Sequence, residues 1–137
     1  MEKKISEKEF ESIIQLPTLE RYSYSLKLIA DCETVWGLVD PLDGKWCMSC
    51  DDNGNEHIPF WPHSKYAETS VEGCWTGAVP KSINLDDFIK IWLPGMVRDK
   101  LKVSLFPTPS QVQISVAPAQ LLKDLVVYCN ENFNEEL

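Results

Sequence analysis

The first thirty residues carry apolar side chains at helical spacing, interrupted by one proline. Ser6 and Glu9 stand three residues apart, the spacing of a capping box, and Pro17 marks the end of the first predicted helix. A second helix is predicted to start after Thr18 and to end near Asp31. The predicted apolar face of the first helix is Phe10, Ile13 and Ile14, and that of the second is Leu19, Tyr22, Leu26, Ile29 and Ala30.

From residue 34 onward the apolar positions alternate instead. The segments 34–40, 46–50 and 56–60 alternate, and clusters rich in Asp, Gly and Asn separate them, which predicts three antiparallel strands in a meander. A proline inside the third segment favours an edge strand or a bulge. In this strand Ile58 and Phe60 are predicted to face inward, and His57, Pro59 and Trp61 outward.

Two further helices are predicted between residues 64 and 95. Ser64 is the predicted N-cap of a short helix, and residues 72–83 are predicted to be a loop with at most a short strand. Asn84 and Asp87 then match a capping box, and Pro94 is predicted to end the helix that follows. The weak apolar face of the short helix is Tyr66, Ala67, Ser70 and Val71, and the regular face of the longer one is Leu85, Phe88, Ile89, Trp92 and Leu93.

The last third predicts a β-hairpin and a final helix. The segments 101–106 and 112–116 alternate around a short Pro-rich and Ser-rich turn, and Pro118 suits the first turn of the helix. The inward positions are Leu101, Val103, Leu105, Val112, Ile114 and Val116, followed by Leu121, Leu122, Leu125, Val126, Cys129 and Phe133 on one helix face. The pattern predicts an α+β fold: a single domain over residues 1–137, with a mostly antiparallel sheet of about five strands and helices packed on it.

Composition narrows the function classes. Thirteen basic and twenty-one acidic side chains give a net charge of -8, which disfavours nucleic acid as a partner. The longest apolar runs are far shorter than the roughly 20 residues that cross a bilayer, so no membrane partner is expected. Residues 1–10 lack the apolar stretch of a secretory signal, and five cysteines are an odd number. We therefore expect a cytoplasmic protein with thiols rather than disulfides.

The segment 43–63 holds two cysteines three apart and both histidines. In an alternating strand Cys47 and Cys50 face opposite sides, about 10 Å apart, which disfavours a disulfide or a shared metal. A zinc site that adds His57 and His63 does not match the usual finger spacing, and a thioredoxin-like site needs a helix after the pair. Asp51, Asn53 and Asn55 imitate a calcium loop, but no glutamate closes it. We expect no metal and no cofactor.

An enzymatic alternative rests on a cysteine and a histidine. The sequence contains no nucleophile elbow, phosphate-binding loop, dinucleotide fingerprint or HExxH motif. Cys74 or Cys47 with His63 leaves a small cysteine hydrolase open, because such partners need not be neighbours in sequence. No catalytic residue is assigned from the pattern.

Four ordered blocks carry a family resemblance. They read RYSYSLKLIADCETVWGL, FWPHSKYAE, INLDDFIKIWLPGM and VSLFPTP. In this order they resemble the bacterial family catalogued as domain of unknown function 2750, from about Arg21 to Leu125. The resemblance implies no catalytic residues to carry over, and Cys47 and Cys50 lie outside the four blocks.

The favoured hypothesis is a protein-binding module of the immunity or adaptor kind. Aromatic residues with a polar handle are enriched at interface hot spots, and several follow the predicted edge strand. The candidate interaction surface is Trp61, His63, Tyr66 and Trp75. The alternative for His63 is a turn residue whose ring satisfies a backbone group, and core packing is favoured for Trp36, Trp46 and Trp92. A structural subunit of a homo-oligomer is a further alternative, because an edge strand also permits self-association.

Overall fold

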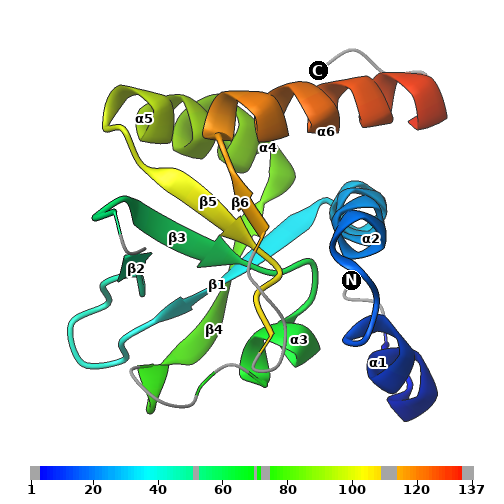
Figure 1. Ribbon diagram of the computed structural model, residues 1–137, viewed down its shortest axis with the longest axis horizontal. Helices are drawn as coiled ribbons and strands as arrows, with labels where there is room; N and C mark the ends of the chain where they lie inside the picture. Colours follow the sequence, from blue (N-terminus) through cyan, green and yellow to red (C-terminus); the bar gives the residue numbers. More distant parts are fainter. Residues whose placement is uncertain (1–3, 51–52, 70, 72–74, 109–113, 134–137) are drawn as a thin grey trace.

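The computed structural model describes residues 4–50, 53–69, 71, 75–108 and 114–133 (Figure 1). The helices are α1 (Glu7–Ile13), α2 (Thr18–Cys32), α3 (Ser64–Glu68), α4 (Leu85–Asp87), the π-helix η2 (Phe88–Trp92), α5 (Leu93–Arg98) and α6 (Pro118–Phe133). The strands are β1 (Thr34–Val39), β2 (Ser49–Cys50), β3 (Glu56–Phe60), β4 (Val79–Asn84), β5 (Lys102–Leu105) and β6 (Ile114–Val116). Among the described residues, no helix is both long and apolar enough to cross a membrane.

The described strands form two sheets that a backbone bridge connects. One sheet has the order β2-β3-β5-β6 and the other pairs β1 with β4. All of these pairs are antiparallel except β3 with β5. The Trp36 and Trp61 backbones exchange hydrogen bonds of 2.9 and 2.7 Å, which joins β1 to the end of β3. The predicted α+β class with a mostly antiparallel sheet is confirmed.

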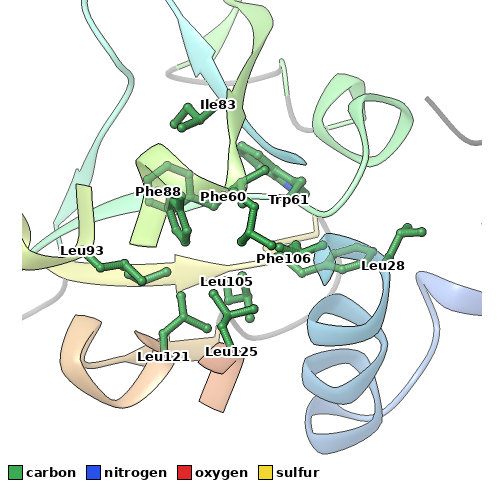
Figure 2. Close-up of a cluster of buried hydrophobic side chains, with 14 of the residues drawn as sticks. Leu28, Phe60, Trp61, Ile83, Phe88, Leu93, Leu105, Phe106, Leu121 and Leu125 are labelled. Carbon is green, nitrogen blue, oxygen red and sulfur yellow. The ribbon is translucent and has the colours of Figure 1, made fainter. Parts of the chain in front are cut away.

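The main core lies between the larger sheet and its helices. Helices α4, α5 and α6 lie together along one side of β5 (Figure 1). In Figure 2 the Leu105 side chain of β5 points toward Leu121 and Leu125 of α6. The Phe60 ring of β3 meets Phe88 edge-on, with 4.9 Å between ring centroids. Each such buried side chain contributes about 1.5–3 kcal/mol.

Strand β3 is an interior strand, so the prediction of an edge strand with an outward face is wrong. It lies between β2 and β5, and its residues from His57 to Phe60 are all buried. Trp61, predicted to face outward, is also fully buried. Parallel pairing explains this burial, because a strand with a parallel neighbour usually has both faces covered.

Strand β4 replaces the predicted loop and changes the topology. Strand β1 pairs along its length with β4, and on its other side it contacts the following segment through a single antiparallel bridge between Val39 and Trp46. The sequence pattern did not predict this strand, because Pro80 lies within it and proline is disfavoured inside strands. The register partner of Pro80 is Leu38, whose carbonyl accepts a hydrogen bond from the Cys47 backbone on the other side of β1. The Pro80 nitrogen therefore faces away from β1, where its missing N–H costs no ladder hydrogen bond.

The helix that begins after Asn84 has the predicted start but a different end. The Asn84 side chain accepts from the Asp87 backbone at 2.8 Å, so the cap is confirmed. Pro94 does not end the helix, because the chain continues through η2 into α5 and stops at Arg98. The Leu93 backbone N–H donates to the Phe88 carbonyl, five residues back. Pro94 has no N–H to donate, and its ring would clash with the preceding turn of a regular α-helix. The wider π-helical turn before it leaves room for the ring.

The predicted face of α2 is confirmed in part, because Ile29 and Ala30 are buried and Tyr22 and Leu26 pack half-buried against the core. Leu19 is 82% exposed, whereas the buried residues are Arg21, Ser25, Leu28, Ile29 and Ala30. Arg21 reaches two backbone carbonyls: its Nη1 donates to Leu16 at 3.1 Å and its Nε to Phe106 at 3.2 Å. The spacing of apolar residues could not identify the whole of the buried face, because a buried guanidinium and a serine are part of it.

The predicted elements at the two ends of the chain are confirmed. The Ser6 side chain accepts from the Glu9 backbone at 3.1 Å. Strands β5 and β6 form the predicted hairpin, and α6 starts at Pro118 with Leu121, Leu125 and Cys129 buried. Ser70, Val112 and the side chain of Phe133 lie outside the described residues.

Candidate functional site

The four residues predicted to form an interaction surface make two ring pairs. Trp61 meets Trp75 edge-on at 6.0 Å, and His63 meets Tyr66 edge-on at 6.2 Å. Trp61 and Tyr66 are fully buried, His63 is 5% exposed, and Trp75 is half-buried. The expectation that Trp61 points to solvent is therefore wrong. A binding role for the set stays a prediction, with Trp75 as its accessible member.

Trp61 fixes the position of Trp75. The Trp61 indole N–H donates to the Pro107 carbonyl at 2.8 Å, and its backbone is bridged to Trp36. The Trp75 indole N–H donates to the Met48 carbonyl at 3.3 Å. The half-buried Trp75 ring is therefore positioned by a ring contact and a hydrogen bond.

A hollow of about 210 Å³ opens beside Trp75. Its lining residues are Asp40, Pro41, Leu42, Cys47, Trp75, Thr76, Gly77 and Ala78. Leu42 stands at its rim with 95% of its surface exposed. Two further exposed apolar residues are near the hollow. Met48, 38% exposed, accepts the hydrogen bond of the Trp75 indole through its carbonyl, and Val79, 42% exposed, follows Ala78 in the chain. We call Leu42, Met48, Trp75 and Val79 the Leu42 surface.

The turn that carries Leu42 is held by its own hydrogen bonds. The Asp40 carboxylate accepts from the Leu42 backbone at 2.8 Å, and the Asp43 carboxylate accepts from the Lys45 backbone at 2.8 Å. Gly44 has φ of 73°, a conformation that favours glycine. The turn therefore presents the Leu42 side chain to solvent from a backbone that hydrogen bonds hold.

His63 is the N-cap of α3 in place of the predicted Ser64. Its backbone is extended, and its Nδ1 accepts from the Lys65 backbone at 3.1 Å. This bears out the alternative interpretation of His63 as a turn residue that satisfies a backbone group. The prediction that Ser64 is the cap is wrong, because Ser64 is already the first helical residue.

Tyr66 lies in a chain of hydrogen-bonded, partly buried side chains. Its hydroxyl is 2.8 Å from that of Tyr24, which donates to Glu9 Oε2 at 2.9 Å. Burial raises the pKa of Tyr66 to about 12. Burial and the bonds to Tyr66 and Glu9 raise the pKa of Tyr24 well above its usual range. Both hydroxyls therefore stay protonated at neutral pH.

Among the described candidates, Cys47, His57 and His63 contact different groups. Cys47 lines the hollow beside Trp75, whereas the ring of His63 lies against Tyr66. His57 is fully buried, with Nε2 at 2.8 Å from Ser115 Oγ and Nδ1 at 3.2 Å from the Asn55 carbonyl. Within the described ranges, no three histidine, cysteine or acidic side chains lie together as a metal site. Cys74 and the side chain of Cys50 lie outside the description.

Sequence reasoning missed two features of this region. An apolar Leu42 inside a polar turn was a visible signal, because nothing in a turn requires a leucine. The pairing of His57 with Ser115 had no such signal, because it joins two strands separated by β5. Trp36, Trp46 and Trp92 are half-buried and pack against the core, as the sequence predicted.

A family model described as "Protein of unknown function (DUF2750)" matches residues 22–125. The chain belongs to this family. The match confirms the resemblance seen in the sequence, and it includes Trp61, His63, Tyr66 and Trp75. Helix α1 and the last turns of α6 lie outside the matched part of this DUF2750 chain. No curated protein has a sequence that matches it.

Proposed function

We propose that this DUF2750 protein binds another protein through the Leu42 surface. The observation that carries the proposal is the display of Leu42, 95% exposed, on a hydrogen-bonded turn beside a tryptophan-lined hollow. Single exposed apolar residues are common and need no function. Here an exposed leucine lies beside a hollow lined by a half-buried indole, and tryptophan is among the residues enriched at interface hot spots.

The size of the hollow favours a protein side chain over a small-molecule ligand. Its volume of about 210 Å³ lies below the roughly 300–1,000 Å³ of typical ligand pockets. A partner would place one apolar side chain against Trp75 and cover Leu42. The bonded turn reduces the entropy lost on association, because its conformation is already fixed.

The proposal is tested by comparing two leucine variants of similar exposure. Leu42→Ser removes the displayed side chain, and Leu19→Ser removes an 82% exposed leucine at the start of α2. Proteins captured from native lysate of the source cells are quantified by mass spectrometry. We expect a protein retained by wild type and Leu19→Ser and depleted by Leu42→Ser. Equal capture by all three chains would contradict the proposal.

Self-association through the same surface is the competing explanation. Light scattering over a concentration series distinguishes the two. A wild-type mass that rises with concentration, and a Leu42→Ser mass that does not, would replace the proposed partner by a second copy of this chain. A mass that stays monomeric in both wild type and Leu42→Ser supports a different protein as the partner.

We infer that this protein binds its partner in the cytoplasm. The sequence has five cysteines, an odd number that does not fit a disulfide framework, and this supports a reducing compartment. Fractionation of source cells with an antibody to the protein tests the assignment, and recovery in an extracytoplasmic fraction would contradict it.

A further inference from the structure

Helix α1 lies on a surface formed by Tyr24, Lys65 and Tyr66, which we call the tyrosine groove. The Phe10 ring stacks on the Tyr66 ring, with 5.6 Å between centroids and 8° between planes. Glu9 accepts from the Tyr24 hydroxyl at 2.9 Å. One helix therefore offers an aromatic ring and a carboxylate to matching groups.

Lys65 provides the remaining contacts of the tyrosine groove. Its Nζ donates to Glu7 Oε1 at 2.8 Å and to the Ile5 carbonyl at 3.1 Å. The same ammonium lies 5.3 Å from the centroid of the Phe10 ring. The tyrosine groove therefore favours a ligand of defined chemistry. A phenyl ring stacks on Tyr66, and carboxylates pair with the Lys65 ammonium and the Tyr24 hydroxyl.

Helix α1 contacts the rest of the chain through half-buried side chains, and Ile5, just before its N-cap, is the buried residue of this segment. The helix has seven residues, none of them buried, and a helix this short is marginal by itself. The Glu7 side chain of its ion pair is 81% exposed, so solvent screens that pair. The family match begins at Tyr22, after α1, whereas all three residues of the tyrosine groove lie inside it.

The tyrosine groove does not depend on α1 for its shape. The Tyr66 ring is 4.7 Å from the Phe106 ring, and the Tyr24 ring is 6.4 Å from it. The two tyrosine hydroxyls are 2.8 Å apart. These contacts join residues of α2, α3 and the end of β5, and none of them involves α1.

We propose that the tyrosine groove is a binding site for an amphipathic helix of another protein. In this proposal α1 occupies the site until the other helix displaces it. The incoming helix carries a phenyl ring adjacent to carboxylates, the chemistry that Glu7, Glu9 and Phe10 supply from within the chain. The site is independent of the Leu42 surface, because the two share no residue.

The test uses a labelled peptide of residues 4–16 of this chain as the probe, with binding read by fluorescence anisotropy. The full-length Phe10→Ala variant weakens the resident helix and leaves the tyrosine groove intact. We expect it to bind the probe about tenfold more tightly than wild type, because a competitor no longer holds the site closed. Glu9→Gln, which preserves side-chain volume, is expected to change affinity in the same direction.

Two controls make the result specific. Lys65→Met combined with Phe10→Ala keeps the aliphatic stem but removes the cation, and the gain in affinity should be lost. Leu42→Ser combined with Phe10→Ala should bind the probe as Phe10→Ala does, so failure of one proposal is distinguishable from failure of the other. Equal probe binding by wild type, Phe10→Ala and Glu9→Gln would overturn the inference.

Discussion

The indole ring of Trp46 occupies the space directly above Gly37. A β-carbon at position 37 would lie 2.7 Å from Cζ3 and 2.9 Å from Cε3 of that ring. The ring is held in place by Trp92, which it meets edge-on at 4.8 Å, and the ammonium of Lys81 lies 5.8 Å from its centroid. Position 37 therefore requires glycine for close packing.

Gly37→Ala is expected to lower the free energy of unfolding by about 1–3 kcal/mol, because the added methyl must displace a packed indole. Urea denaturation gives the change. Gly95→Ala is the matched control. Its β-carbon would lie 3.5 Å from an Arg98 nitrogen, an ordinary contact, and alanine in a helix stabilises by about 0.5–1 kcal/mol relative to glycine. Equal effects at the two positions would contradict the packing argument.

Arg21→Lys is expected to destabilise the fold by about 2 kcal/mol, because lysine cannot donate to the Leu16 and Phe106 carbonyls in the same geometry. Burial lowers the pKa of Arg21, but a guanidinium stays charged in proteins. Chemical denaturation measures the loss. Lys27→Met on the same helix removes an exposed cation paired with Asp31, and little change is expected. A larger loss at Lys27 than at Arg21 would reject this assignment.

His63→Ala is expected to cost about 1 kcal/mol, because the Lys65 backbone N–H loses its acceptor at the start of α3. His63→Asn should recover part of the loss, since asparagine is a good N-cap. Thermal denaturation provides the comparison. Ser64→Ala tests the cap that the sequence suggested. If it cost more than His63→Ala, Ser64 would be the cap after all.

Stability is expected to fall with alkaline pH through Tyr66. The pKa of this hydroxyl is about 12 in the folded chain and about 10 in an unfolded one. Between these values the unfolded state loses a proton that the folded state keeps. The stability that Tyr66 contributes is therefore complete below about pH 10 and is lost as the pH rises toward about 12.

Tyr66→Phe should reduce this alkaline dependence by up to about 1.4 kcal/mol per pH unit in that window. Urea denaturation from about pH 8 to about pH 11 gives the two slopes, and absorbance of tyrosinate follows the ionisation directly. Tyr22, whose pKa is also raised by burial and by its bond to Asp124, is present in both proteins and serves as the common background. Tyr24 keeps the effects of burial and Glu9 on its pKa but loses that of Tyr66, so its share of the slope also falls in the variant. Identical slopes would show that Tyr66 does not titrate in this range.

Local chemistry was enough to locate most helix starts. Ser6 and Asn84 cap their helices as predicted, because a cap depends on a few neighbouring residues. The candidate site was only partly predictable. The aromatic residues were identified, but which of them reach solvent depends on chain segments far away in sequence. Pro107 bonds Trp61, and α1 covers Tyr66.

The sequence by itself determined the α+β class and the closing hairpin with α6, because these follow from periodicity and local motifs, and it carried the family resemblance in four ordered blocks. Only the tertiary structure decided that β3 is interior, that β1 pairs with β4 across Pro80, and that Arg21 is buried. The physical reason is the same in each case. Strand order and burial are set by contacts between distant segments, and alternation within one strand does not reveal whether its second face is also covered.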